Sequence, residues 1–197
     1  MDLTIASWSR RRDEHGRTLG WAHHIGFSWL LSLGALRYFA RVNWSDAHRL
    51  VFVCSGNICR SPYAEARARA SGVRATSFGL TATSGSPANS MAITIAAERG
   101  VDLEPHRART ATDVVLSAHD VIVAMEPGQA WRLRRSTTIP GAQLTLLGLW
   151  ADPPRPYLQD PYGMSSAYFR TCFALIDTAV YTMSAQLGTK DRCAGLP

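Results

Sequence analysis

The stretch that decides the fold is Leu50-Val51-Phe52-Val53-Cys54-Ser55-Gly56-Asn57-Ile58-Cys59-Arg60-Ser61-Pro62. Its first four residues are all apolar, which is typical of a strand buried on both faces of a parallel sheet. Ser61 and Pro62 indicate a helix start, because serine caps free N–H groups and proline suits the first helical position. Strong helix formers occupy residues 64–70. Cys54 to Arg60 are therefore predicted to form a loop that leads from a strand into a helix N-terminus.

A loop of this kind is suited to bind an anion. Backbone N–H groups and the dipole at a helix N-terminus attract negative charge, and Arg60 adds a planar, bidentate guanidinium. The same field favours the thiolate of Cys54, which is the nucleophilic form of cysteine. A thiolate beside a bound oxyanion predicts phosphoryl transfer. The alternative is a merely buried cysteine at the end of a core strand, which leaves Gly56, Asn57 and Arg60 at this spacing unexplained.

Residues 53–62, together with Ala64 and Glu65, resemble the signature of the low-molecular-weight protein tyrosine phosphatases. The resemblance implies a phosphate-binding loop between the first strand and the first helix. It also implies a phosphocysteine intermediate on Cys54, with Arg60 stabilising the transition state. The residues that it implies for phosphate binding are Ser55, Gly56, Asn57, Ile58, Cys59, Arg60 and Ser61.

The rest of the chain alternates predicted strands with predicted helices. This alternation with short links favours one α/β domain, with a four-stranded parallel sheet and helices on both of its faces. Further strands are predicted at 75–78, 120–125 and 144–147, and helices at 88–99, 131–135 and 165–187. Between them lies His106, in a segment similar to the family's His-x-Ala-Arg. By resemblance His106 supports the loop near Asn57 and Ser61, and a solvated loop histidine is the alternative.

Splitting a phosphate monoester requires an acid for the leaving oxygen, and two Asp-Pro pairs, at Asp152 and Asp160, are candidates. Asp160-Pro161-Tyr162 matches the family's Asp-Pro-Tyr motif, so Asp160 is predicted as general acid and then general base. Because an ordinary aspartate is ionised at pH 7, this role needs surroundings that favour the protonated form. Tyr162 offers an aromatic wall for a phosphotyrosine ring. The mechanism requires no metal and no organic cofactor.

The four cysteines show no zinc-binding spacing, and a catalytic thiolate favours the reducing cytoplasm. By resemblance, Cys59 forms a reversible, redox-sensitive disulfide with Cys54. Cys172 is predicted in the core and Cys193 in a terminal tail. The net charge of +6 comes from scattered arginines without a nucleic-acid motif, so we expect an anionic substrate and no nucleic-acid partner.

The domain prediction is an N-terminal extension at 1–48, the phosphatase domain at 49–190 and a tail at 191–197. Residues 1–18 are polar, basic and predicted to be mobile. Residues 21–41 are predicted as one extra amphipathic helix whose apolar run is too short to span a bilayer and is not followed by a signal-peptide cleavage site. Its apolar stripe is Trp21, Ile25, Trp29, Leu33 and Leu36. Two alternatives stay open. The favoured one is a helix that covers apolar surface of the domain or of a second subunit, and the other is peripheral membrane contact through residues 20–44.

Single residues of the chain argue against the competing functions. An arsenate reductase of this fold needs further cysteines, and none occurs between Cys59 and Cys172. Arginine-phosphate phosphatases of the family typically carry Thr where this chain has Ile58. A non-catalytic phosphotyrosine-binding module does not need Cys54, Arg60 and Asp160 together. The expected partner is a tyrosine-phosphorylated protein. Met125-Glu126 and residues 147–150 are similar to bacterial members that oppose a tyrosine kinase in capsule or exopolysaccharide export.

Overall fold

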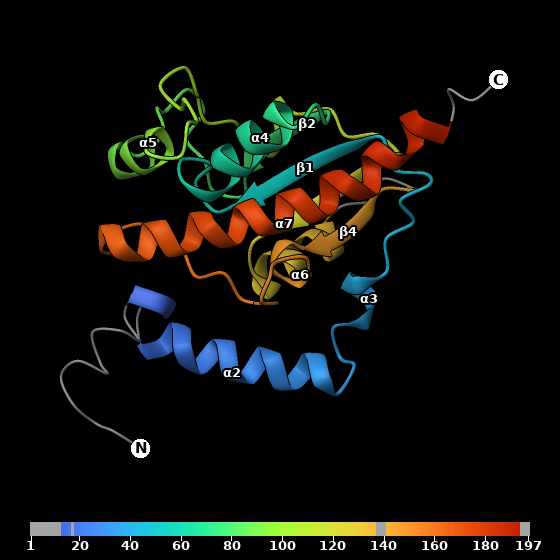
Figure 1. Ribbon diagram of the computed structural model, residues 1–197, viewed down its shortest axis with the longest axis horizontal. Coiled ribbons are helices and arrows are strands. Elements are labelled where there is room, and N and C mark those ends of the chain that lie inside the picture. Colours follow the sequence, from blue (N-terminus) through green and yellow to red (C-terminus); the bar gives the residue numbers. More distant parts are fainter. Residues whose placement is uncertain (1–12, 17, 137–140, 194–197) are drawn as a thin grey trace.

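A computed structural model describes residues 13–16, 18–136 and 141–193 of the chain (Figure 1). The helices are α2 (Thr18–Ser32), α3 (Arg37–Ala40), α4 (Arg60–Ala70), α5 (Ser90–Ala97), α6 (Pro127–Ser136) and α7 (Ser166–Cys193), with short 3-10 turns η1 (Ala111–Asp113) and η2 (Leu147–Leu149). The strands are β1 (Arg49–Cys54), β2 (Ala75–Gly79), β3 (Asp120–Ala124) and β4 (Gln143–Leu146).

The four strands form one parallel sheet in the order β2-β1-β3-β4, which confirms the predicted fold class. Leu50 of β1 pairs with Ala75 on one side and with Val121 on the other, so β1 is a central strand. Because parallel strands end at the same edge, the loop after β1 and the loops after β2 and β3 meet there.

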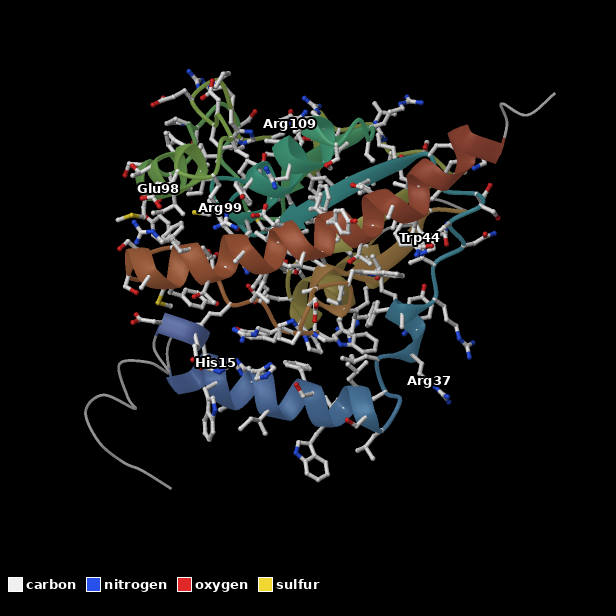
Figure 2. All side chains as sticks on the ribbon, in the orientation of Figure 1. His15, Arg37, Trp44, Glu98, Arg99 and Arg109 are labelled. Carbon is white, nitrogen blue, oxygen red and sulfur yellow. The ribbon has the colours of Figure 1, made fainter. Side chains whose placement is uncertain are left out.

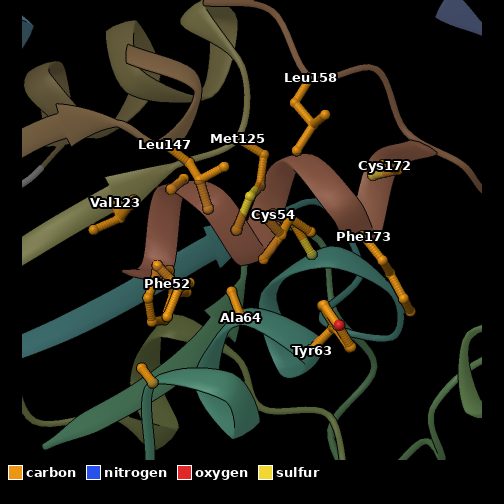
Figure 3. Close-up of a cluster of buried hydrophobic side chains, with 14 of the residues drawn as sticks. Phe52, Cys54, Tyr63, Ala64, Val123, Met125, Leu147, Leu158, Cys172 and Phe173 are labelled. Atoms are coloured by element: carbon orange, nitrogen blue, oxygen red, sulfur yellow. The ribbon is translucent and has the colours of Figure 1, made fainter. Parts of the chain in front are cut away.

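Alternate residues of β1 enter two separate hydrophobic cores. Leu50 and Phe52 pack into the first core, under α4 and α7, together with Tyr63 and Phe173 (Figure 3). Val51 and Val53 pack into the second core, beneath α3 and α6. Burial on both faces explains why β1 is a continuous apolar run rather than an alternating one.

Several element ends differ from the sequence prediction. α5 starts at Ser90 instead of Ala88, because the side chain of Asn89 accepts a hydrogen bond from Ala92 N and caps the helix. α7 continues to Cys193, beyond the predicted end at Leu187. Residues 191–193 are therefore helical rather than a tail, and residues 194–197 lie outside the described part of the chain.

Over residues 21–41, where one helix was predicted, the structure has the end of α2 followed by α3. The chain turns between α2 and α3 at Gly34, whose φ of 76° is a left-handed value that breaks a helix. α2 is also not amphipathic, because it carries no Asp, Glu, Lys or Arg on any side. Of the segment predicted to be mobile, residues 1–12 and 17 lie outside the described residues, whereas the backbone oxygen of Asp13 accepts a hydrogen bond from Thr171 Oγ1. The boundary at residue 48 stays a prediction.

Part of the predicted apolar stripe faces away from the domain, whereas Leu36 at its end is buried in the second core. Trp29 is 67% exposed and Leu33 just after the helix is 75% exposed. The opposite side of α2 contacts the domain, where Phe27 stacks on Tyr157 with ring centroids 5.8 Å apart. α2 thus covers the domain with the side that the periodicity did not select. None of the helices in the described residues is long and apolar enough to span a bilayer.

Candidate active site

The loop between β1 and α4 wraps around the sulfur of Cys54. The backbone N–H of Asn57 donates to Cys54 Sγ at 3.2 Å, and Ser61 Oγ lies 3.0 Å from the same sulfur. Ser61 therefore does not cap the helix as predicted. α4 begins one residue earlier, at Arg60, with Cys59 in the cap position and no side-chain cap bond. Pro62 is the third helical residue, where a missing N–H costs nothing.

Asn57 holds the loop in its unusual shape. Its φ of 54° is the one positive value outside glycine among the described residues. The buried carboxamide donates to Ser61 Oγ and to Ser77 Oγ, both at 2.8 Å, and accepts from Arg109 N at 2.8 Å. These three bonds offset the cost of the left-handed backbone. They also form a chain from Asn57 through Ser61 to the sulfur of Cys54.

His106 braces the loop from outside. Its Nε2 donates to the backbone oxygen of Asn57 at 2.7 Å. Burial lowers the pKa of His106, and this effect outweighs the opposing hydrogen bond to Asn57. The neutral imidazole is thus the form that fits the fold, and His106 lies where the sequence placed a supporting histidine.

Replacing His106 with glutamine should flatten the pH dependence of stability. With a lowered folded-state pKa, the contribution of His106 to the free energy of unfolding is complete above the ordinary histidine value of 6.5 and is lost as the pH falls through the folded-state pKa. His106→Gln keeps an N–H donor without this titration. Urea unfolding from pH 8 down to roughly pH 5 measures the effect. His48→Gln, at an exposed position, is the matched control, and equal slopes for wild type and His106→Gln would contradict the expectation.

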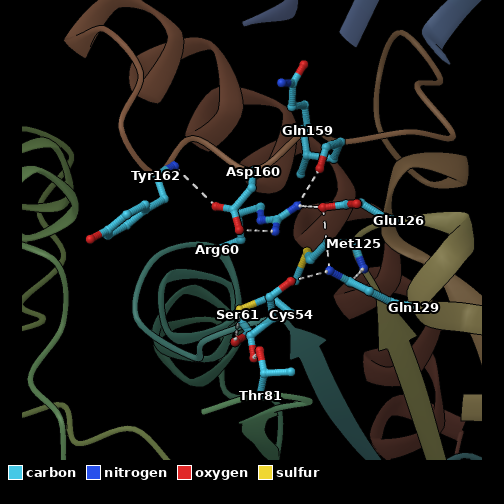
Figure 4. A network of polar contacts seen from close by, with 12 residues as sticks. Cys54, Arg60, Ser61, Thr81, Met125, Glu126, Gln129, Gln159, Asp160 and Tyr162 are labelled. Carbon is cyan, nitrogen blue, oxygen red and sulfur yellow. Dashed lines mark hydrogen bonds and ion pairs between the residues drawn. The ribbon is translucent and has the colours of Figure 1, made fainter. Parts of the chain in front are cut away.

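Arg60 is completely buried and lies at the centre of an ionic network (Figure 4). Its Nη1 donates to Glu126 Oε1 and, at 2.6 Å, to the backbone oxygen of Leu158, while its Nη2 is 2.7 Å from Asp160 Oδ2. Burial by itself lowers the pKa of Arg60, but the carboxylates of Asp160 and Glu126 raise it by more, so the guanidinium stays charged. The nucleophile loop and the Asp160 loop are thereby joined across the sheet edge.

A cavity of about 240 Å³ lies in front of Cys54 and is lined by Cys54, Ser55, Gly56, Ile58, Cys59, Thr81, Asp160 and Tyr162. Among the described residues, the backbone N–H groups of Gly56, Ile58 and Cys59 donate no backbone hydrogen bond, so they are available to an anion there. Tyr162 is 61% exposed, in keeping with a wall that a ligand covers. Asn57, Arg60 and Ser61, which the sequence predicts to bind phosphate, do not line this cavity, and neither does His106.

Three residues of the site were missed by the sequence prediction. Glu126 follows β3 and pairs with Arg60, and Gln129 donates to Ser55 Oγ at 3.3 Å. Thr81 N donates to the Ser55 oxygen at 2.9 Å after β2 passes close to the loop at Gly79. A Cβ on Gly79 would lie 2.6 Å from that oxygen. Their position just after β2 and β3, at the carboxyl edge of the sheet, was the available signal.

The other cysteines of the core are less suited to act as nucleophiles. Burial raises the pKa of Cys172 to about 12, and Cys172 is completely buried as predicted. Burial raises the pKa of Cys59 even further, with the negative charges of Asp160 and Cys54 adding to the effect. Cys59 nevertheless lines the same cavity as Cys54.

The model of the family described as low molecular weight phosphotyrosine protein phosphatase matches residues 49–192. The chain belongs to this family. Among relatives of this low-molecular-weight phosphatase, the probable protein-tyrosine-phosphatase EpsP of Ralstonia nicotianae is 32% identical over 133 residues, covering 66% of this chain and 90% of the relative. Wzb of Vibrio vulnificus, solved with benzylphosphonate, has a TM-score of 0.62 and 30% identity over 72% of this chain and 99% of its own.

The fold of this phosphatase also occurs in a phosphatase that acts on a different substrate. The YwlE arginine phosphatase of Geobacillus stearothermophilus has a TM-score of 0.65, at 24% identity, over 76% of this chain and 99% of its own. At that identity the likeness shows the fold only. The choice of phosphate ester must therefore be argued from side chains in the cavity.

Proposed function

We propose that the protein is a phosphotyrosine phosphatase in which Cys54 is the nucleophile, Arg60 stabilises the transition state and Asp160 is the general acid and base. The observation that carries this assignment is the shared cavity, which Cys54 lines from the β1 loop and Asp160 from the loop before α7. Belonging to the family supports the same assignment.

In the first step the Cys54 thiolate attacks phosphorus, an S–P bond forms and the P–O bond to the phenol breaks. Phosphate oxygens compete with Asp160 for the Arg60 guanidinium, which now lies 2.7 Å from the carboxylate. The dianion leaves Asp160 facing negative charge, which favours the protonated acid. Asp160 then gives its proton to the departing phenolate oxygen.

In the second step water replaces the sulfur. Asp160, now ionised, takes a proton from the water, an O–P bond forms and the S–P bond breaks. The leaving thiolate can only accept hydrogen bonds, so the Ser61 hydroxyl, 3.0 Å from Sγ, must donate to it. The N–H of Asn57 donates to the same sulfur. Both bonds stabilise the thiolate as nucleophile and as leaving group.

The lining of the cavity supports an aryl phosphate rather than phosphoarginine. Ile58 presents an apolar side chain to the cavity and Tyr162 presents an aromatic ring, both suited to a phenyl group. Hydrolysis of a phosphotyrosine peptide and of phosphoarginine, without added metal and in a reducing buffer, tests this choice.

We expect the kcat/KM of the wild type to be higher for phosphotyrosine than for phosphoarginine. Ile58→Thr should shift the ratio of these two kcat/KM values towards phosphoarginine by roughly tenfold or more, which is about the effect of one unfavourable apolar or polar contact on specificity. Thr81→Val, at another residue of the cavity lining, controls for a general loss of activity. A wild type that prefers phosphoarginine would overturn the proposed substrate, although not the mechanism.

Two further assignments belong to this proposal. A peroxide oxidises the Cys54 thiolate to a sulfenic acid and is itself reduced. Condensation with the Cys59 thiol then releases water and gives a disulfide that reductants reverse. The second assignment places the enzyme in the reducing cytoplasm, where its substrate is a tyrosine-phosphorylated protein such as a bacterial tyrosine kinase. The names of relatives such as EpsP support a bacterial setting for this partner.

A further inference from the structure

The outer side of α2 presents a continuous set of large apolar side chains to solvent. Ile25 is 38% exposed, Trp29 67% and Leu30 40%, and Leu33, one residue beyond the helix, is 75% exposed. Spacings of three and four residues place these side chains on neighbouring positions of one helix surface. Monomeric proteins seldom leave such a group uncovered unless it contacts a partner.

The inner side of α2 cannot account for these residues, because it already has its own contacts. His23 and Phe27 both lie against Tyr157, with ring centroids 4.7 Å and 5.8 Å apart. Leu31 packs against the second core. A helix that is apolar on every side is normally covered on every side. The domain covers one side of α2, so a surface outside this domain is required to cover the opposite side.

The apolar surface continues from α2 onto α3 and α6. Tyr38 of α3 is 52% exposed, and Trp131 of α6 is 38% exposed. Arg134 lies over both rings, 4.5 Å from the Tyr38 centroid and 5.6 Å from the Trp131 centroid. Phe39, buried beneath them, contacts Trp131 edge to face at 5.1 Å.

The charge on this surface has one sign. Its exposed arginines are Arg37, Arg41, Arg132, Arg134 and Arg135. Residues 15–45 and 127–136, which supply α2, α3 and α6, contain no Asp or Glu. Figure 2 shows Arg37 extending from α3 away from the domain. A surface of exposed Trp, Tyr and Leu with arginines and without carboxylates complements a layer of anionic headgroups.

We propose that α2, α3 and α6 form a docking surface for an anionic lipid bilayer. Trp29, Leu30 and Leu33 enter the headgroup region, and the arginines contact lipid phosphates. α2 has 15 residues and is thus about 22 Å long, less than the roughly 30 Å of a hydrocarbon core, so it lies in the plane of the interface. No residue that lines the catalytic cavity belongs to these helices. This inference goes beyond the proposed function and does not rest on it.

The test is sedimentation of the full-length protein with vesicles of phosphatidylcholine, with or without anionic phosphatidylglycerol. Binding is expected with the anionic vesicles and should weaken as salt is added. The double variant Trp29→Ser/Leu33→Ser should lower partitioning at least about tenfold, because two exposed apolar side chains no longer enter the interface. Arg134→Gln/Arg135→Gln should lower it by roughly tenfold or more.

The matched controls are Tyr181→Ser, which removes a 77% exposed aromatic side chain from α7, and Arg74→Gln, which removes an exposed arginine next to β2. Both should bind vesicles as the wild type does, and all variants should hydrolyse p-nitrophenyl phosphate at the wild-type rate. Failure to bind anionic vesicles, or binding that survives Trp29→Ser/Leu33→Ser, overturns the proposal. A dimer in gel filtration that this variant dissociates, without vesicle binding, overturns it in favour of a second copy of the chain.

Discussion

Cys54→Ser should lose turnover of p-nitrophenyl phosphate by at least about 10⁴-fold, since the hydroxyl of serine is a far weaker nucleophile than a thiolate at neutral pH. The sulfur accepts from Asn57 N at 3.2 Å and lies 3.0 Å from Ser61 Oγ. A serine oxygen can keep both contacts, so the loop and its anion site should remain. The expected result is therefore an inactive protein that still binds an aryl phosphonate with an affinity close to that of the wild type, as measured by calorimetry.

Cys172→Ala is the control for loss of a thiol elsewhere. Cys172 is buried in the first core and does not line the cavity, so this variant should lose stability and keep its kcat. Turnover by Cys54→Ser near the wild-type level would remove Cys54 from the mechanism. A wild type that is folded, reduced and inactive would leave only the phosphotyrosine-binding alternative.

Asp160→Ala should lower kcat by roughly 10²- to 10⁴-fold while leaving KM nearly unchanged, which is the usual effect of removing a general acid. The loss should be smaller for substrates whose phenol is a better leaving group, because such a phenolate departs without a proton. Asp160 also pairs with Arg60 at 2.7 Å. Its removal frees the guanidinium for phosphate, so trapping of phosphoprotein from a lysate should improve.

The second Asp-Pro pair of the chain supplies the matched control. Asp152 is exposed and does not line the cavity, although its local sequence is the same type as that of Asp160. Asp152→Ala should therefore keep kcat within about twofold of the wild type, as expected for a surface substitution. An equal loss in the two variants would show that the effect comes from the proline-rich loop 151–163 as a whole and not from the Asp160 carboxylate.

Features that depend on residues close together in the sequence could be predicted from the sequence alone. The strand-loop-helix unit around Cys54, the parallel sheet and the position of Asp160 at its edge all follow from local patterns. Ser61 shows the limit of this approach. A serine before a proline looks like a helix cap, but tertiary contacts with Asn57 and Cys54 give its hydroxyl a different use. Glu126 reaches Arg60 across 66 residues of chain, a contact that no local pattern contains.

The orientation of α2 could not be predicted for a different reason. Apolar residues occur on all its sides, so periodicity offers more than one stripe and cannot say which one meets the domain. Phe27 and His23 determine which side of α2 meets the domain, because they contact the ring of Tyr157 in a loop more than a hundred residues further along the chain. The break at Gly34 likewise depends on a backbone angle that glycine permits but does not require.

The contact between α2 and the proline-rich loop changes what counts as the enzyme. Gly20 fits so closely against the Gln159 side chain that a Cβ there would overlap it, and Phe27 stacks on Tyr157 only three residues before Asp160. The N-terminal helix α2, which lies outside the family match, thus packs against the loop that carries Asp160. A fragment trimmed to the length of its relatives would have a free Tyr157 and a less constrained Asp160. Rates obtained from such a fragment would describe a different catalyst from the one that residues 1–197 form together.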